Sequence, residues 1–335
     1  MKKYLITAIM LIAGLSACKE ENFSSMEYYK YVLYMLSKED YNVYSDVFPY
    51  SDGVATVGYF SIGCGGSLAN PEEVTVYLEN DTVLLNKYNR ANYDIDTSKY
   101  ARLLSDNNYS IETMQITVPA GNIEQYVKVA VSVLADGLSP DSTYFIPLAI
   151  KNVSRYEVNP DKFNMLFRIV VENHYAGTLK DTYYSMKGNT LNNNGEILAG
   201  SGIAATKLAR PISKNAVRIF AGTGPVKADF GIDPVLAKPT LPELNKYGIT
   251  LTVDASNRVT ITPYAPFGSI EVEQIDGDGL NIYAEERNNM VDDTVTKYFY
   301  LRYRYRTLKT PATDTSPAVY NAWVFVNETL KRLEE

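Results

Sequence analysis

The side chains that most often carry catalysis are scarce in this chain of 335 residues. The sequence contains one histidine, His174, and two cysteines, Cys18 and Cys64. A zinc site built on imidazole rings needs more nitrogen ligands than this, and two thiolates cannot make up the deficit. A serine triad would have to use His174, and no Gly-x-Ser-x-Gly motif is present to hold the nucleophile. We therefore expect neither metal-dependent nor triad-type catalysis.

Signals for cofactors and cations are also missing. The sequence has no Walker loop, and no dinucleotide fingerprint lies between a strand and a helix. Residues 276–279 read Asp-Gly-Asp-Gly, which is how a calcium loop can begin. An EF-hand starting at Asp276 would need an oxygen ligand at position five, glycine at six and glutamate at twelve. Those positions hold Leu280, Asn281 and Arg287, so we expect a hairpin turn, no metal and no cofactor.

Glycoside hydrolysis stays open as an alternative because it needs only two carboxylates. The chain has 39 acidic residues, but no pair lies in a recognisable acid–base context. A glycosidase would need two carboxyl groups about 5–9.5 Å apart in a cleft. The pattern of elements does not fit a TIM barrel, and we expect a binding protein rather than an enzyme.

Tyrosine is unusually frequent, with 28 residues beside a single tryptophan. Tyrosine suits half-buried strands, and this preference accounts for most of the 28. An exposed ring can also stack on the apolar face of a sugar while polar neighbours bind the hydroxyl groups. The candidate ligand-binding rings are Trp323 in a terminal strand, Tyr283, and Tyr264 and Phe267 in a proline-containing loop. Each of these four rings could instead belong to a core.

The N-terminus carries a lipoprotein signal. Lys2 and Lys3 precede an apolar stretch at residues 5–15 that is too short to span a bilayer. Residues 15–18 read Leu-Ser-Ala-Cys, a lipobox that predicts cleavage after residue 17 and lipidation of Cys18. Two or three acyl chains would give stable attachment, so we expect an outer-membrane lipid anchor. Residues 19–21, Lys-Glu-Glu, resemble a surface-export signal of Bacteroidetes lipoproteins, which implies exposure on the cell surface.

The remaining cysteine and the charge balance exclude further classes. With Cys18 lipidated, Cys64 has no partner for an intrachain disulfide, and we expect a small buried side chain. The formal net charge is −7, which argues against a nucleic-acid partner. Arg302, Arg304 and Arg306 alternate along a strand and are expected to line one solvated face.

The first half of the mature chain alternates between apolar and polar residues, as strands do. We predict strands at residues 28–36, 54–62, 73–78, 113–118, 126–134, 144–150 and 164–171. Pro147 favours an edge strand or a bulge, and Thr97 predicts the start of a short helix. About seven short strands in about 145 residues predict an immunoglobulin-like β-sandwich.

The second half predicts another antiparallel domain, either a β-barrel or a sandwich. Strands are expected at residues 177–186, 297–306 and 320–326, with a hairpin turn at Asn194-Gly195. Two further hairpins are expected at residues 249–262 and 269–284, and a short helix at residues 239–247 would end at Gly248 in the C′ position.

These patterns give an all-β chain with four segments. They are a signal peptide at residues 1–17, a lipidated tether at 18–25, the sandwich at 26–172 and the C-terminal β-domain at 173–335. The polar boundary contains His174, which we expect to form hydrogen bonds between the domains rather than to act in catalysis.

The chain also resembles a Bacteroidetes family of two-domain surface lipoproteins, in which an N-terminal immunoglobulin-like domain and a C-terminal β-domain are both of unknown function. Besides the lipobox, the resemblance rests on the strand patterns at residues 74–78, 116–121, 144–150 and 298–303, together with Tyr88-Asn89. Such proteins are often encoded in glycan-utilisation loci, beside outer-membrane transporters and glycosidases. The resemblance therefore implies a glycan ligand and a transporter complex of the same locus as partners, but it supplies no binding residues.

The sequence leaves three hypotheses. The first is a glycan-binding surface lipoprotein whose C-terminal domain presents aromatic rings. The second is a structural, adhesin or pilus-assembly lipoprotein that pairs through sheet edges. The third is a glycoside hydrolase.

Overall fold

The computed structural model describes residues 27–334, apart from 39, 225–240, 265–268 and 289–293. The predicted signal peptide, the lipidation site Cys18, the tether and the candidate Phe267 therefore lie outside the described residues. Within the described part of the chain, no helix has the length and apolar character needed to cross a membrane.

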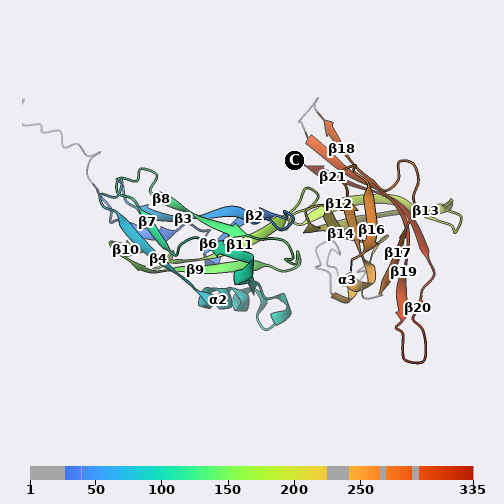
Figure 1. Ribbon diagram of the computed structural model, residues 1–335, viewed down its shortest axis with the longest axis horizontal. Coiled ribbons are helices and arrows are strands. Elements are labelled where there is room, and N and C mark those ends of the chain that lie inside the picture. The colour runs from blue at the N-terminus through green and yellow to red at the C-terminus, as the bar shows by residue number, and fades with distance from the viewer. Residues whose placement is uncertain (1–26, 39, 225–240, 265–268, 289–293, 335) are drawn as a thin grey trace, which may run out of the picture.

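Two β-domains lie end to end (Figure 1). The elements of the first domain are β1 (Val32–Met35), η2 (Asp40–Asn42), β2 (Val43–Pro49), β3 (Thr56–Gly65), β4 (Val74–Asn80), α2 (Thr82–Tyr93), η3 (Thr97–Lys99), β5 (Arg102–Leu103), η4 (Asp106–Asn108), β6 (Tyr109–Ile111), β7 (Gln115–Val118), β8 (Tyr126–Val133), β9 (Tyr144–Val153), β10 (Glu157–Val158) and β11 (Asn164–Glu172).

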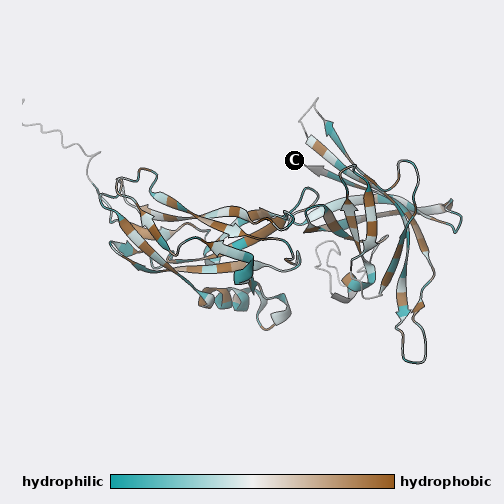
Figure 2. Cartoon of the chain, in the orientation of Figure 1, coloured by the Kyte–Doolittle hydropathy of each residue, from teal (hydrophilic) through white to brown (hydrophobic). Residues whose placement is uncertain are grey.

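The first domain is the predicted β-sandwich. One sheet has the strand order β10-β1-β3-β8-β6, and the other has the order β2-β11-β9-β4-β7 with β5 beside β9. The two sheets pack through their apolar inner faces. On strand β8, for example, Val129, Val131 and Val133 are buried, whereas Lys128 and Ala130 are exposed. The apolar side chains of the two inner faces form one core. Hydrophobic and hydrophilic residues are interspersed along the strands of this domain (Figure 2).

Two local predictions for this domain need correction. Pro147 lies in β9, a central strand, and pairs with Leu166 without a bulge. The carbonyl of Pro147 accepts from the N–H of Asp81, so the nitrogen of Pro147 faces the same side, where β4 has already ended. A proline is tolerated there because the ladder requires no N–H donor at that position. The helix expected at Thr97 is only the short turn η3, and the substantial helix is α2, whose N-cap is Asp81.

The second domain is one antiparallel sheet. Its elements are β12 (Thr182–Leu191), β13 (Ile197–Ser213), β14 (Ala216–Phe220), α3 (Leu241–Tyr247), β15 (Gly248–Val253), β16 (Val259–Pro263), β17 (Ile270–Gln274), β18 (Ile282–Asn288), β19 (Thr294–Thr310), β20 (Val319–Tyr320) and β21 (Val324–Glu334). The strand order is β16-β15-β14-β13-β12-β21-β19-β17, and β18 and β20 also pair with β19.

The sheet curls so that its two ends meet. The N–H of Val259 on β16 donates to the carbonyl of Asn281 at 2.7 Å, and the N–H of Ile261 donates to the side chain of Gln274 on β17 at 3.1 Å. These contacts give the domain a barrel-like form, one of the two forms predicted. An apolar core that includes Tyr184, Phe299 and Tyr303 fills its interior.

The pairing around β19 differs from the sequence prediction. Residues 269–284 were expected to form a hairpin, but β17 and β18 do not pair with each other. Instead β17 pairs with residues 303–307 of β19 and β18 pairs with residues 294–300. A 17-residue strand is long enough to hold both short strands in succession. Gly248 directly follows helix α3, as predicted, but it begins β15 and does not have the positive φ of a C′ glycine. An added Cβ would lie 2.4 Å from the carbonyl oxygen of Leu244.

The boundary at residue 173 stays a prediction. Strand β11 ends at Glu172 and belongs to the sandwich sheet, whereas Thr182 begins the barrel-like sheet. Contacts hold the two domains together: Arg218 on β14 forms two hydrogen bonds to Asp141 of the sandwich, at 2.5 and 2.8 Å, and Lys214 forms an ion pair with Asp52 at 2.9 Å.

Candidate functional site

The four aromatic rings singled out in the sequence do not come together. Trp323 is half-buried on the outer face of the barrel-like sheet, and Tyr264 lies where the two domains meet. Tyr283 is buried, and Phe267 lies outside the described residues.

Tyr283 is a core residue, so its assignment as a ligand platform is corrected. Its side chain is 5 % exposed and points inward from β18, with its ring centroid 4.8 Å from that of Tyr175 and 5.0 Å from that of Phe299. Only its hydroxyl reaches polar groups. The alternation of β18 puts this ring inside the sheet, and its face cannot meet a ligand.

Tyr264 takes part in the domain contact. The Arg218 guanidinium carbon lies 4.9 Å from the centre of its ring, and the same guanidinium binds Asp141 of the sandwich. The cation–π contact therefore makes this ring part of the contact between the two domains.

Trp323 belongs to a surface that we call the outer strip. It consists of side chains on the outer face of β17, β19, β20 and β21 and of the residues next to them: Glu271, Glu273, Arg304, Arg306, Tyr320, Trp323 and Phe325. Phe325 is covered within this strip and is only 8 % exposed. The guanidinium carbons of Arg304 and Arg306 lie 4.5 and 4.6 Å from the centre of the Trp323 ring. Arg306 also lies 4.8 Å from the Tyr320 ring, and Arg304 lies 5.6 Å from the Phe325 ring.

Carboxylates of β17 hold the two arginines in place. Arg304 Nε donates to Glu273 at 2.7 Å, and Arg306 Nε donates to Glu271 at 2.5 Å. Each pair neutralises its charge, so the strip presents rings and hydrogen-bonding groups without a strong field of one sign. The rings are therefore fixed before any ligand arrives, which lowers the entropic cost of binding.

The aromatic character continues along β19. Tyr298 and Tyr300 also face outward, and their rings stack with centroids 5.8 Å apart and planes 12° from parallel. Arg302 between them and the strip donates to the carbonyl of Gly195 at 2.5 Å. The arginines do face outward from the sheet, as predicted, but the prediction did not include the aromatic rings against which Arg304 and Arg306 pack. The sequence could have predicted part of this surface, because Tyr298, Tyr300 and the arginines occupy alternate positions along β19 and so lie on the same face.

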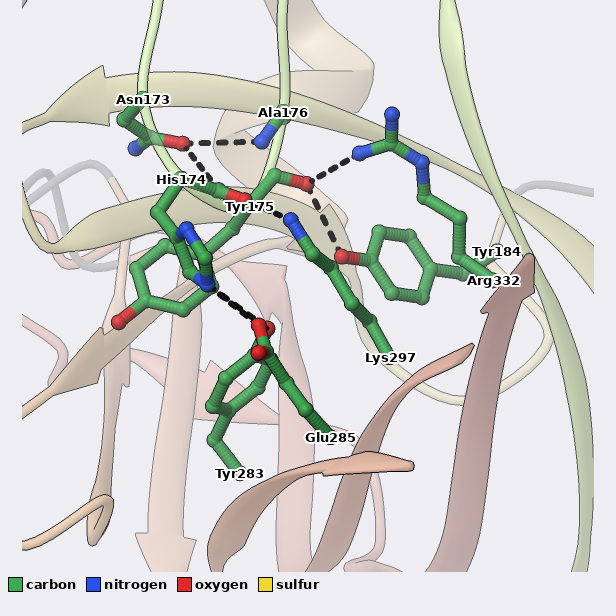
Figure 3. Close-up of polar contacts among 9 residues, drawn as sticks. All are labelled: Asn173, His174, Tyr175, Ala176, Tyr184, Tyr283, Glu285, Lys297 and Arg332. Atoms are coloured by element: carbon green, nitrogen blue, oxygen red, sulfur yellow. Dashed lines mark hydrogen bonds and ion pairs between the residues drawn. The ribbon is translucent and has the colours of Figure 1, made fainter. Parts of the chain in front are cut away.

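The single histidine lies in a separate polar cluster at the domain boundary (Figure 3). His174 Nε2 and the Tyr283 hydroxyl both contact Glu285 Oε1, and the hydroxyl lies 3.2 Å from the histidine nitrogen. Burial raises the pKa of Glu285, but the hydrogen bonds from Tyr283 and His174 outweigh it, so this pKa lies below its usual value. The ring of His174 therefore contacts two residues of the C-terminal domain. The prediction that His174 forms hydrogen bonds between the two domains was wrong for its side chain.

The same cluster fixes the linker backbone. Lys297 Nζ donates to the carbonyl of His174 at 2.5 Å, and the carbonyl of Tyr175 accepts from Tyr184 at 2.9 Å and from Arg332 at 3.0 Å (Figure 3). The Asn173 side-chain oxygen accepts from the N–H groups of Tyr175 and Ala176, each at 2.9 Å. Because Lys297, Tyr184 and Arg332 all donate to backbone carbonyls of the linker, the cluster is a structural clamp.

Other chemistry finds little support in the described residues. Among them, no group of three or more His, Cys, Asp or Glu side chains could hold a metal ion. Glu271 and Glu273 are bound to arginines, so neither stands ready as a general acid or base.

Sandwich, barrel-like domain and outer strip together define a two-domain β-protein with a preformed aromatic surface. A family model for an N-terminal domain matches residues 28–157, and a family model for a C-terminal domain matches residues 163–331. The second model alone covers half of the chain, and the chain belongs to this two-domain family.

Solved structures share the whole architecture. A multidomain protein including DUF1735 from Bacteroides ovatus is 14 % identical, with a TM-score of 0.62 over 90 % of this chain and 94 % of that one. A second Bacteroides ovatus protein, of unknown function, is 16 % identical, with a TM-score of 0.64 over the same shares. An auxiliary nutrient binding protein from Bacteroides thetaiotaomicron is 17 % identical, with a TM-score of 0.53 over 87 % and 90 %. At these identities the likeness shows the fold alone. No curated protein matches the chain in sequence.

Proposed function

We propose that this protein is a lipid-anchored glycan-binding protein of the outer membrane, exposed on the cell surface, and that the outer strip is its glycan-binding surface. The observation that carries the proposal is Trp323, a ring held over two arginines that are themselves fixed by carboxylates. Sugars offer an apolar ring face to such an indole, and their hydroxyl groups suit paired guanidinium and carboxylate groups.

The fold and the sequence support the same proposal. One protein of this fold is an auxiliary nutrient binding protein. The lipobox at residues 15–18 supports the anchor, and the family resemblance supports a transporter complex of the same locus as a partner. The described part of the chain begins at the end of the sandwich that lies far from the barrel-like domain (Figure 1). A lipid at Cys18 would therefore let the sandwich act as a spacer that carries the outer strip away from the membrane.

Affinity electrophoresis of the protein from residue 22 onward tests the proposal. Gels would carry soluble xylan, α-mannan, β-glucan, starch and pectin, and the variants would be Trp323→Ala and, as a matched control, Tyr59→Ala. Tyr59 is an exposed aromatic residue on the sandwich. We expect retardation by one glycan class, and we expect it to be strongly reduced by Trp323→Ala and unchanged by Tyr59→Ala. Migration unchanged on every gel would contradict the proposal and favour the assembly hypothesis.

A further inference from the structure

A groove of about 820 Å³ lies in the sandwich domain beside helix α2. Its walls come from the turn η2, the end of β4, the first half of α2 and the loop that precedes β11. The volume falls within the range of small-molecule sites, which is about 300–1,000 Å³. This groove lies in the other domain from the outer strip, so it is a separate place on the molecule.

A chain of buried amides forms the base of the groove. Asn42 Nδ2 donates to the carbonyl of Asp161 at 2.8 Å and to Asn164 Oδ1 at 3.1 Å, and Asn164 Nδ2 donates to Asp81 Oδ2 at 2.9 Å. The other oxygen of Asp81 accepts from the N–H of Val83 at 3.1 Å. Asn42 and Asn164 are both 8 % exposed. Because each of these groups already has partners, the base is rigid before a ligand binds.

The rim offers a different set of groups. Phe163 is 38 % exposed and Val83 is 73 % exposed, so apolar surface remains uncovered inside a polar groove. Asp40, Asp161 and Lys87 are exposed lining residues that carry the free polar groups of the rim. An aromatic ring flanked by carboxylate acceptors and an ammonium donor matches the alternating apolar faces and hydroxyl groups of a sugar.

The charges narrow the ligand further. Glu79 is paired with Lys151 at 3.3 Å, and the remaining acidic side chains outnumber the one lysine of the lining. An anionic glycan would be repelled.

We propose that this groove is a second glycan-binding site, which takes a short neutral stretch of a polysaccharide with one sugar ring against Phe163. This inference rests on the proposed function in one respect: both sites are assigned the same class of ligand. Two sites on the two domains would hold one long chain at separate points and raise its apparent affinity through effective concentration.

The test uses the full chain from residue 22 and compares Phe163→Ala and Asp40→Asn with Ile123→Ala, each made with and without Trp323→Ala. Ile123 is 90 % exposed on the same domain and is no part of the groove lining, so it controls for loss of an apolar surface residue. The probes are neutral xylo-, manno-, malto- and laminarihexaose, with oligogalacturonate as the anionic probe and deacetylated chitohexaose as the cationic one. Calorimetry gives affinity and stoichiometry, and amide exchange with bound probe locates the site.

We expect Trp323→Ala to retain weak binding of one neutral hexaose, with slowed amide exchange at residues 79–87 and 160–164. Adding Phe163→Ala or Asp40→Asn should weaken that binding at least tenfold, whereas adding Ile123→Ala should not. The groove is ruled out if Trp323→Ala alone abolishes binding, if the groove variants leave binding unchanged, or if only a charged probe binds there. If wild-type protein binds no probe, the proposed function fails as well, and that result differs from a protein that binds through the outer strip alone.

Discussion

At the scale of single residues, the most unusual feature is an ion pair inside the barrel-like domain. Lys207 Nζ lies 2.7 Å from both carboxylate oxygens of Glu328, and the Tyr303 hydroxyl donates to Glu328 at 3.0 Å. Burial lowers the pKa of Lys207 and raises that of Glu328, while their mutual attraction and hydrogen bonds oppose both shifts. Neither charge can be left alone there without a large desolvation cost.

Removing one partner of this pair should therefore destabilise the domain strongly. We expect Glu328→Gln to lower the free energy of unfolding by about 3–5 kcal/mol, because it leaves Lys207 buried without a countercharge. The double variant Lys207→Met with Glu328→Leu should recover most of that loss. Urea denaturation followed by circular dichroism measures both. A double variant as unstable as the single one would show that the ion pair does more than satisfy its own charges.

Glu27 gives the chain a pH-dependent contact. Its carboxylate accepts from the N–H groups of Ser67 at 2.8 Å and Leu68 at 2.7 Å. Burial acts to raise its pKa, but these hydrogen bonds prevail and lower the pKa to about 2. A lowered pKa stabilises the folded state above the ordinary value of 4.5, and this stabilisation disappears as pH falls from there towards about 2.

We therefore expect Glu27→Gln to remove part of the loss of stability between pH 5 and pH 2. Chemical denaturation of wild type and variant across that range measures the difference, and NMR titration of the Glu27 carboxyl carbon measures its pKa directly. A pKa near 4.5 would contradict the account of the hydrogen-bonded carboxylate.

At the scale of elements, β19 organises the second domain. It pairs with β17, β18, β20 and β21, and its alternation places Phe299 and Leu301 inside and the arginines of the outer strip outside. The sequence predicted this alternation because it is a local property with a period of two. The partners of β17 and β18 could not be predicted, since they depend on the length of a distant strand.

Helix α2 shows the opposite limitation. Asp81 is a good N-cap, and Leu84, Leu85 and Tyr88 lie on one helical face. This helical pattern is short, and the segments before and after it have the alternating pattern of strands, so the sequence analysis did not predict the helix. The helix forms because Leu84 and Leu85 pack against Phe145 and Leu166 on the sheet, which local sequence does not reveal.

The pairing of β12 with β21 requires a residue without a side chain. A Cβ on Gly188 would lie 2.2 Å from the carbonyl oxygen of Asn327, whereas a Cβ on Gly202, in the adjoining strand β13, would meet nothing within 4 Å. We expect Gly188→Ala to cost about 1–3 kcal/mol of stability. Gly202→Ala should be neutral or slightly stabilising. Thermal unfolding compares the two, and equal effects would show that the close approach is not limiting.

At the scale of the whole molecule, the domain contact sets the direction of the outer strip. Arg218 is 2 % exposed and binds Asp141 with both terminal nitrogens, while the Lys214–Asp52 pair is exposed. Buried charge pairs lose much when one partner is removed, and exposed pairs lose little. The terminal position of Trp323 favoured an accessible ring, and this ring is half-buried on the outer strip. No sequence pattern revealed that Tyr264 would lie at the domain contact or that Tyr283 would be buried.

Asp141→Ala should therefore loosen the two domains, whereas Lys214→Ala should not. Small-angle X-ray scattering would show a broader distribution of maximum dimensions for Asp141→Ala, with both domains still folded by circular dichroism. Identical scattering from the two variants would mean that the linker clamp around Asn173 and His174 fixes the orientation alone.

The central claim, that the outer strip binds glycans, is tested most directly by calorimetric titration of the glycan that the gels select. The titrated proteins are wild type, Trp323→Phe, Trp323→Ala and Tyr59→Ala. A central aromatic anchor contributes about 2 kcal/mol or more, so Trp323→Ala should weaken binding by about 30-fold. Trp323→Phe should lose less, and Tyr59→Ala should match wild type. Equal affinities for all four proteins would place the glycan elsewhere and contradict the account.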